Sequence, residues 1–314
     1  MKIKIYAIVG STASGKSSLA MALAESMGGE IISCDSMQVY KRMNIGTAKP
    51  TAEEQSRVKH HMIDINEPWE SFSCADYVSL ADSAIRDCHG RGKLPIVCGG
   101  TGLYLDALLR GADFGEENGN AELRQELLDF AEKNGAEALH RELQRIDPES
   151  AEKTHPNNVK RVARAIEIYK LSGVTKTELD RRSQLEEPRF DAKVIGLHYD
   201  DREVLCSRID KRVDAMIAEG LCEETAELEK EGIFERNSTA AQAIGYKELL
   251  PYVREEDNLE NCVDELKRAT RRYAKRQITW FGGKKYVESL PVMENGRIKT
   301  FEEIVNNAKE LFFN

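Results

Sequence analysis

Eight residues near the N-terminus have types and a spacing that suit binding of a phosphorylated compound. They read Gly10-Ser11-Thr12-Ala13-Ser14-Gly15-Lys16-Ser17. The glycines let the backbone curl so that its N–H groups point inward, Lys16 adds a positive charge, and the Ser17 hydroxyl can bind Mg²⁺. Residues 3–9 predict a strand before this segment and residues 18–27 a helix after it, whose N-terminus attracts anions. The segment therefore predicts a phosphate-binding loop, without identifying the phosphorylated compound.

A carboxylate follows the next predicted strand, residues 30–34. Asp35 comes at the carboxyl end of that strand, where open α/β sheets bind ligands, so we expect it beside the phosphate loop. It can act as a Mg²⁺ ligand, as a general base, or only as a helix cap together with Ser36. Gln38 favours substrate recognition, because a glutamine amide can pair bidentately with an adenine edge.

A glycine-rich turn follows the predicted strand 94–98. Its residues are Gly99-Gly100-Thr101-Gly102. Glycines allow close approach of the backbone to a ligand, and Thr101 offers a hydroxyl group there. The alternative is an ordinary tight turn between a strand and a helix.

Cations gather on one face of a predicted C-terminal helix, residues 259–280. They are Lys267, Arg268, Arg271, Arg272, Lys275 and Arg276. Asp264 and Glu265 are the only acids between positions 264 and 285, so the face is predicted to be positive and to contact a phosphate backbone. A second set of cations falls on a predicted helix in the middle of the chain: Lys160, Arg161 and Arg164.

Arg208 and Arg212 lie one turn apart on a predicted helix, residues 201–219. Arginine suits bidentate phosphate binding, which makes both candidates for a phosphate clamp. The alternative is that they pair with acids of the same helix, namely Glu203, Asp210 or Asp214.

These candidate residues need a framework that brings them together. Strands and helices alternate up to residue 110, which predicts an α/β fold with a parallel sheet flanked by helices, like that of P-loop NTPases. Residues 111–120 are rich in glycine and acid and predict a boundary. Only helical patterns follow until the strand at 193–198. We therefore predict a core of residues 1–110 and 191–314, and an all-helical insertion at 111–190.

The composition limits the classes of protein that fit. The chain has 314 residues, a hydrophobic fraction of 41% and a net charge of −9. Acidity argues only mildly against a nucleic-acid partner, because the charges segregate along the chain. No apolar run predicts a membrane span or a signal peptide, and seven dispersed cysteines argue against disulfides and a zinc site. We expect a cytoplasmic monomer.

Six motifs resemble those of the tRNA dimethylallyltransferase family, and they occur in the family's order along nearly the whole chain. They are residues 10–17, Asp35–Gln38, Asn44–Pro50, Gly99–Tyr104, Ala243–Lys247 and Ala274–Trp280. Two departures are minor: Ser11 replaces the usual proline, and Ser17 replaces the usual threonine but keeps its hydroxyl. No zinc-finger extension of the eukaryotic type follows, so the resemblance is to bacterial members.

The resemblance implies an enzyme that transfers a dimethylallyl group from dimethylallyl diphosphate to N6 of adenosine 37 beside the tRNA anticodon, with Mg²⁺. It implies that Asp35 is the general base, that Thr101 lies near the reacting centre, and that residues 10–17 and Arg212, with Arg208 second, hold the diphosphate. It also implies that a set of residues contacts the tRNA anticodon stem-loop. That set is Asp35, Ser36, Met37, Gln38, Thr101, Arg124, Lys160, Arg161, Val162, Ala163, Arg164, Arg271 and Arg272.

Three alternatives remain at this level. The chain can be a P-loop kinase for a small molecule, an adenylate isopentenyltransferase for a free nucleotide, or a non-catalytic RNA-binding regulator. The basic helix and the helical insertion disfavour the first two, since a free nucleotide needs no such surface. The combination of Lys16, Asp35 and Thr101 disfavours the third.

Overall fold

The computed structural model of the chain describes residues 2–110, 120–185, 187–237 and 239–313. These residues divide into two compact units, one formed by Met1–Leu109 and Phe190–Asn314, the other by Arg110–Arg189. The glycine- and acid-rich boundary predicted at 111–120 lies outside the described residues, except for Asn120. No helix in the described ranges is long and apolar enough to span a membrane.

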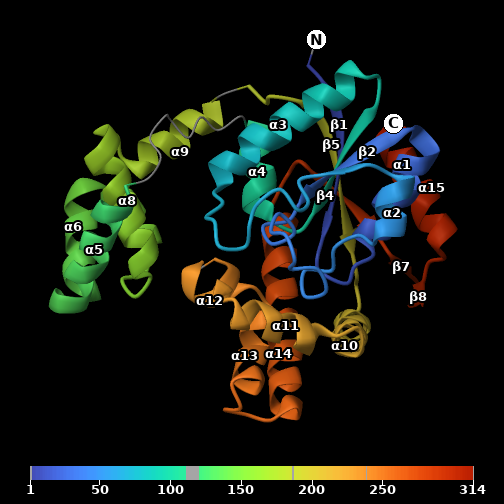
Figure 1. Cartoon of the computed structure of the whole chain (residues 1–314). Coiled ribbons are helices and arrows are strands. Elements are labelled where there is room, and N and C mark those ends of the chain that lie inside the picture. Colours follow the sequence, from blue (N-terminus) through green and yellow to red (C-terminus); the bar gives the residue numbers. More distant parts are fainter. Residues whose placement is uncertain (1, 111–119, 186, 238, 314) are drawn as a thin grey trace. The chain divides into compact units, whose positions relative to one another are not determined.

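A six-stranded sheet with the order β3-β2-β4-β1-β5-β6 forms the centre of the first unit (Figure 1). All its pairings are parallel, which confirms the predicted parallel α/β sheet. The strands are β1 (Lys4–Gly10), β2 (Gly29–Cys34), β3 (His60–His61), β4 (Leu94–Gly99), β5 (Asp191–His198) and β6 (Val287–Pro291). The inner strands are covered on both faces and read as apolar runs. Strand β6 escaped sequence-based prediction because Leu290 is its only buried residue.

Strand β3 is shorter than expected. The sequence predicts a strand over residues 61–65, but the extended backbone ends after His61. Met62 and Asp64 have φ angles of 65° and 54°, in the left-handed region that breaks a strand.

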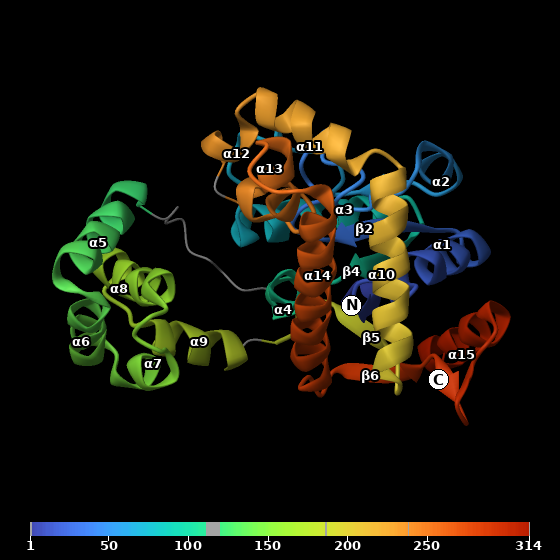
Figure 2. The same ribbon diagram turned by 90° about the horizontal axis from the view of Figure 1, so that it is seen from below.

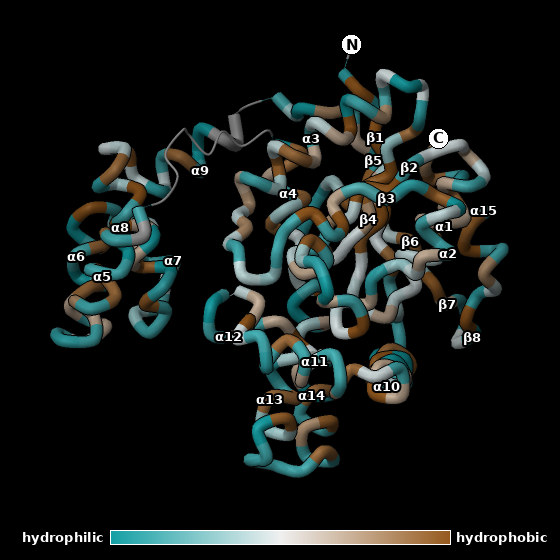
Figure 3. The backbone as a smooth tube through the Cα atoms, in the orientation of Figure 1, coloured by the Kyte–Doolittle hydropathy of each residue, from teal (hydrophilic) through white to brown (hydrophobic). Residues whose placement is uncertain are grey.

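Helices cover both faces of the sheet. Helices α1 (Lys16–Met27) and α15 (Phe301–Phe313) share one hydrophobic cluster with the sheet, while α3 (Cys74–Gly90) and α14 (Leu259–Gly282) contact it outside that cluster. Figure 3 shows the hydrophobic colour concentrated in the central strands. The remaining elements around the sheet are α2 (Ala52–Arg57), α4 (Gly102–Arg110), β7 (Met293–Glu294) and β8 (Arg297–Ile298).

A second hydrophobic cluster joins the segment after β2 to the C-terminal helices. Val39, Tyr40 and Met43 are buried against residues of α10 (Arg202–Ala218), α11 (Leu221–Lys230), α13 (Tyr246–Val253) and α14. Helices α10 and α14 run side by side in Figure 2. Two short elements complete this region: α12 (Ile233–Arg236) and the 3₁₀ turn Ala240–Gln242. This cluster fixes the segment that carries Asp35 against helices from the other end of the chain.

The second unit contains helices only, within its described residues. They are α5 (Ala121–Asn134), α6 (Ala136–Ile146), α7 (Pro148–Lys153), α8 (Val159–Ser172) and α9 (Lys176–Leu185). Its hydrophobic core includes Leu127, Leu143 and Ile166. Glu167 is fully buried beside this core, and its carboxylate pairs with Arg124 at 3.0 Å and Arg164 at 2.9 Å.

Candidate active site

The phosphate loop leads from β1 into α1 as the sequence predicts. Gly15 has a φ of 93° and Ala13 a φ of 60°, the turned backbone that points N–H groups inward. No side chain caps the start of α1, and no acid occupies its first turn. The first N–H groups and the positive end of the helix dipole are therefore available to an anion.

Helix α14 holds the phosphate loop through one buried side chain. The Gln277 Oε1 atom accepts from the Thr12 backbone N–H at 2.8 Å, and Gln277 Nε2 donates to the Gly100 carbonyl at 3.1 Å. Gln277 is only 5% exposed, so neither bond competes with bulk water. A single glutamine thus links the loops that follow β1 and β4.

Arg208 and Arg212 of α10 lie on the side of the phosphate loop. Arg208 Nε donates to the Ala13 carbonyl at 2.9 Å, and its guanidinium lies 5.7 Å from the centre of the Tyr199 ring. Arg212 is half-buried and lines the same cavity as Lys16. These contacts favour the phosphate-clamp interpretation of both arginines.

Two of the three candidate acids of α10, Asp210 and Asp214, pair with another helix and not with Arg208 or Arg212. Asp210 accepts from Arg271 of α14 at 2.9 Å, and Asp214 forms an ion pair with Lys267 of α14 at 2.5 Å. Asp210 and Asp214 are one turn apart, as are Arg208 and Arg212, so α10 presents acids to α14 and arginines to the phosphate loop.

Two neighbouring cavities meet at this point. A cavity of about 330 Å³ is surrounded by the phosphate loop and cations, with the lining Ala13, Gly15, Lys16, Ser17, Ser18, Arg208, Lys211 and Arg212. A second cavity of about 260 Å³ is lined by Asp35 and apolar side chains such as Val213 and Met216. Lys16, Ser17 and Arg212 line both cavities. The arrangement places a cavity lined by four cations directly beside a cavity that contains a carboxylate.

Burial destabilises the charged forms of Lys16 and Arg212. Desolvation lowers the pKa of Lys16, and the nearby Arg212 guanidinium lowers it further, while Asp35 opposes the shift. Burial also lowers the pKa of Arg212, again against the attraction of Asp35. A bound anion would therefore stabilise the charged forms of both side chains, because its negative charge would compensate their lost hydration.

Asp35 lies in the second cavity, that of about 260 Å³, and is held by its own turn. Its Oδ1 atom accepts from the Met37 N–H at 2.9 Å and the Gln38 N–H at 3.4 Å. The Thr101 hydroxyl, from the neighbouring strand end, accepts from the Ser36 N–H at 3.1 Å. The turn of residues 35–38 is thus stabilised by the Asp35 side chain within the turn and by the Thr101 side chain from the neighbouring strand end.

The Gln38 side chain has protein partners in this structure. Its Oε1 accepts from the Ser33 hydroxyl at 2.8 Å, and its Nε2 donates to the carbonyls of Thr47 and Ala48 at 3.1 and 3.2 Å. Both amide N–H groups are used in these bonds. Gln38 lines the cavity, and its role in reading an adenine stays a prediction.

The glycines of residues 99–102 serve close packing within the chain. A Cβ at Gly99 would lie 2.0 Å from the Cys34 carbonyl oxygen, and one at Gly100 would lie 2.1 Å from Gln277 Nε2. A Cβ at Gly102 would meet the Trp280 ring at 2.3 Å. These glycines therefore allow tight contacts with β2 and α14, and, because Gly99 also lines the cavity that contains Asp35, their approach to a ligand stays a prediction.

Three cavity residues on α14 were missed in the sequence. Tyr273, Arg276 and Gln277 line the cavity that contains Asp35, and Tyr273 lies near Thr101 and Asp35. Their spacing of three and four residues puts them on one helix face. That spacing is the available signal, but it also fits the positive face to which the sequence assigns Arg276.

The positive face predicted on α14 is largely neutralised by acids. Besides the pairs with α10 already described, Arg272 pairs with Glu265 at 2.5 Å, and Arg268 lies 3.6 Å from Glu265. The sequence predicts that only Asp264 and Glu265 oppose these cations, but α10 adds the carboxylates of Asp210 and Asp214. Lys275 is exposed and has no ion pair within the described ranges.

The predicted tRNA-contacting segment on α8 is only partly available. Val162 and Ala163 are fully buried in the core of the helical unit, so their side chains cannot contact a partner. This corrects their assignment as tRNA-binding residues. Lys160 and Arg161 are exposed, and Arg164 is half-buried beside Glu167.

Comparisons with known proteins cover almost the whole chain. Residues 38–284 match the family described as IPP transferase, and residues 3–70 match the isopentenyl transferase family. A tRNA dimethylallyltransferase of Thermoanaerobacter sp. (strain X514) is 44% identical, over 98% of this chain and 96% of that protein.

Solved structures agree with these sequence matches. The tRNA isopentenylpyrophosphate transferase of Bacillus halodurans has 44% identity and a TM-score of 0.70, over 99% of this chain and 97% of that one. A eukaryotic dimethylallyltransferase that acts on tRNA has 33% identity and a TM-score of 0.78, over 92% of this chain and 74% of that one.

Proposed function

The chain belongs to the IPP transferase family, and on this basis we propose that it transfers a dimethylallyl group from dimethylallyl diphosphate to N6 of adenosine 37 in tRNA. The observation that carries the proposal is the common wall of Lys16, Ser17 and Arg212 between a cationic cavity and a chamber containing Asp35. Such a wall suits a reaction in which an anionic group leaves on one side while a nucleophile loses a proton on the other.

The cationic cavity would hold the diphosphate of the donor. Lys16, Arg208, Lys211 and Arg212 surround it together with the uncapped N-terminus of α1. As the bond between C1 of the dimethylallyl group and the diphosphate oxygen breaks, negative charge collects on that oxygen. Fixed donors aimed at this charge stabilise the transition state more than the ground state.

Asp35 would serve as the general base. The adenine N6 attacks C1, the N6–C1 bond forms as the C1–O bond breaks, and the N6 proton passes to the Asp35 carboxylate. An exocyclic amine is a weak nucleophile, so removal of its proton during attack lowers the barrier. Thr101 would act by holding the turn that carries Asp35, since its hydroxyl accepts from the Ser36 N–H.

A divalent cation fits this site. The Ser17 hydroxyl is exposed and lines both cavities, and Asp35 lines one of them, so the wall offers the oxygen donors that Mg²⁺ prefers. We propose that Ser17 would supply a protein ligand and the donor diphosphate most of the others. When bound, Mg²⁺ would neutralise charge on the leaving diphosphate.

A tracer experiment tests the proposed reaction. Radiolabelled dimethylallyl diphosphate is incubated with the protein, Mg²⁺, and either unmodified tRNA or AMP. We expect label in tRNA and none in AMP. Label in AMP alone would indicate an adenylate isopentenyltransferase, and ATP hydrolysis without label in either acceptor would indicate a kinase.

We further propose that tRNA binding depends on cations of both units. Lys160 and Arg161 are exposed and have no ion pair within the part of the chain that the structure describes. Four other candidate cations already pair with carboxylates, and each would have to replace its carboxylate by a tRNA phosphate. They are Arg124, Arg164, Arg271 and Arg272. The partners of Arg271 and Arg272 are partly exposed, so these two pairs are weak and the exchange is feasible at a polyanion surface. Arg124 and Arg164 share the fully buried Glu167, so their exchange costs more.

The affinity for tRNA should fall steeply with salt, and Arg161→Gln should reduce the slope of log K against log salt by about 1. The reason is that each unpaired cation in contact with phosphate releases about one counterion. Binding titrations at several salt concentrations measure the slope. Arg145→Gln is the matched control, since it removes one charge from the same unit outside residues 160–164. A flat salt profile for the wild type would contradict the proposed interface.

A further inference from the structure

The segment between β2 and α2 forms part of the active-site wall, and one carboxylate holds it. Glu224 of α11 accepts from three consecutive backbone N–H groups: Asn44 at 3.0 Å, Ile45 at 2.9 Å and Gly46 at 3.3 Å. Gly46 lines the cavity that contains Asp35, as do the next two residues. A charged acceptor of several backbone N–H groups makes stronger hydrogen bonds than a neutral one.

Tyr246 of α13 completes this contact. Its hydroxyl donates to Glu224 Oε1 at 2.6 Å, and its ring lies so close to Gly46 that a Cβ there would meet it at 2.5 Å. Burial and the neighbouring Glu224 carboxylate raise the pKa of Tyr246, so the phenol keeps the proton that it donates. The backbone at Gly46 is therefore enclosed by a carboxylate and an aromatic ring.

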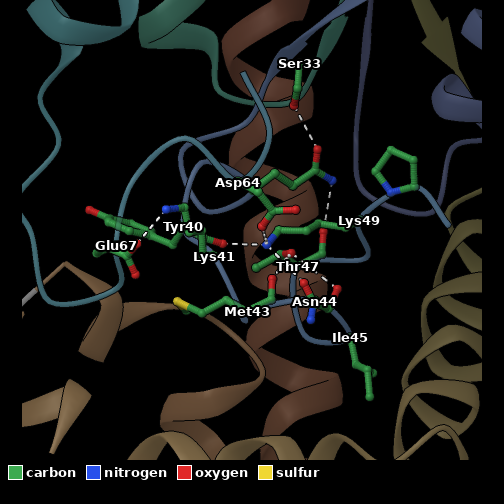
Figure 4. A network of polar contacts seen from close by, with 12 residues as sticks. Ser33, Tyr40, Lys41, Met43, Asn44, Ile45, Thr47, Lys49, Asp64 and Glu67 are labelled. Atoms are coloured by element: carbon green, nitrogen blue, oxygen red, sulfur yellow. Dashed lines mark hydrogen bonds and ion pairs between the residues drawn. The ribbon is translucent and has the colours of Figure 1, made fainter. Parts of the chain in front are cut away.

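The far end of the same loop is fixed by a lysine, as Figure 4 shows. The Lys49 ammonium contacts the Tyr40 carbonyl, the Asp64 carboxylate and Asn44 Oδ1, the last at 3.1 Å. Its side chain is only 4% exposed. Residues 44–49 are thus held at both ends, and Thr47 and Ala48 between them have a defined position.

The loop in turn holds the segment that carries Asp35. The carbonyls of Thr47 and Ala48 accept from Gln38 Nε2, and the backbone N–H of Gln38 donates to Asp35 Oδ1. A continuous series of hydrogen bonds therefore leads from Glu224 through the loop and Gln38 to Asp35.

We infer that Glu224, supported by Tyr246, is a positioning residue that orients Asp35 for proton removal. This role rests on the proposed function. Glu224 is not among the cavity-lining residues of the described chain, so it acts through the loop and not on the substrates. A shift of the base by about 1 Å can lower the rate by about 100-fold without changing the groups that bind the donor.

The test compares kcat with donor affinity in two variants. Glu224→Ala should lower kcat by about 100-fold, whereas Glu224→Gln should lose less, because its amide oxygen still accepts from the loop N–H groups. Donor affinity, measured by calorimetry with an unreactive thiodiphosphate analogue of dimethylallyl diphosphate, should stay within about twofold of the wild type, since the cationic cavity is unchanged. Assays well below the unfolding temperature keep stability from limiting the rate.

Glu231→Gln is the matched control. The Glu231 carboxylate, directly after α11, pairs with Arg42 at an exposed position, so its removal loosens the same region without touching residues 44–46. Its kcat should stay near the wild-type value. The double variant Glu224→Ala with Lys49→Met should lose no more than the larger single effect, because both residues act by holding the loop of residues 44–49.

Several outcomes would overturn this role. The first is a kcat of Glu224→Ala close to that of the wild type, and the second is a loss of donor affinity equal to the loss of kcat/KM. The third is a fall in the kcat of Glu231→Gln as large as that of Glu224→Ala. The fourth is additive effects on kcat in the double variant. An inactive wild type would instead overturn the proposed function and this role with it.

Discussion

Replacement of Asp35 by asparagine is expected to lower kcat for tRNA prenylation by about 10²- to 10⁴-fold, the range of a lost general base. The amide keeps the size and the Oδ1 acceptor that binds the N–H groups of Met37 and Gln38, so the turn should persist. It cannot accept the N6 proton. Single-turnover assays at saturating donor and tRNA measure this change directly.

Donor affinity separates the two chemical roles that remain open for Asp35. If the carboxylate is only the base, Asp35→Asn should bind the thiodiphosphate analogue, in the presence of Mg²⁺, about as tightly as the wild type. A large loss of affinity would place Asp35 in the metal shell. Ser36→Ala is the control for donor affinity, since it keeps the backbone N–H that donates to Thr101 and loses only the hydroxyl that accepts from Thr101 at 3.5 Å.

Lys16→Met is expected to lower kcat/KM for the donor by about 10²- to 10³-fold. The substitution keeps the length of the side chain but removes the charge that faces both cavities. The loss should exceed that of Lys211→Met, whose side chain is exposed and lines only the cationic cavity. Steady-state kinetics with varied donor measure both values, and equal effects would contradict a central role for Lys16.

The wild type should also show a pH dependence that Lys16→Met lacks. Burial and Arg212 lower the pKa of Lys16 below its usual value of 10.5. The free protein therefore loses this charge at a lower pH than an exposed lysine would, and donor capture should decline as the pH rises toward 10.5. A profile of kcat/KM for the donor against pH, flat in Lys16→Met over the same range, tests the assignment.

Local sequence determined the parts of this protein that depend on neighbours in the chain. The phosphate loop needs only its glycines, Lys16 and a strand–helix context, and the parallel sheet follows from buried strands that alternate with helices. Asp35 was predicted beside the loop because the carboxyl ends of parallel strands share one edge. Residues 10–17 and Asp35 could therefore be assigned to the site before any packing was known.

Only the tertiary structure decided the roles that depend on partners far along the chain. The sequence of α14 shows six cations and three acids, and two further carboxylates that pair with its positive face, Asp210 and Asp214, come from α10. Gln277 binds a loop 265 residues away, and Glu224 binds one 178 to 180 residues away. Val162 lies in a basic sequence segment but points into a core.

The physical reason is the same in each case. A side chain's hydrogen bonds and ion pairs depend on which element packs against it, and that packing is set by the burial of apolar surface on several helices and strands at once. The types and spacing of residues therefore indicate phosphate chemistry and a carboxylate base. The contacts between distant elements decide which cations remain for the substrates and which residues hold the base in place.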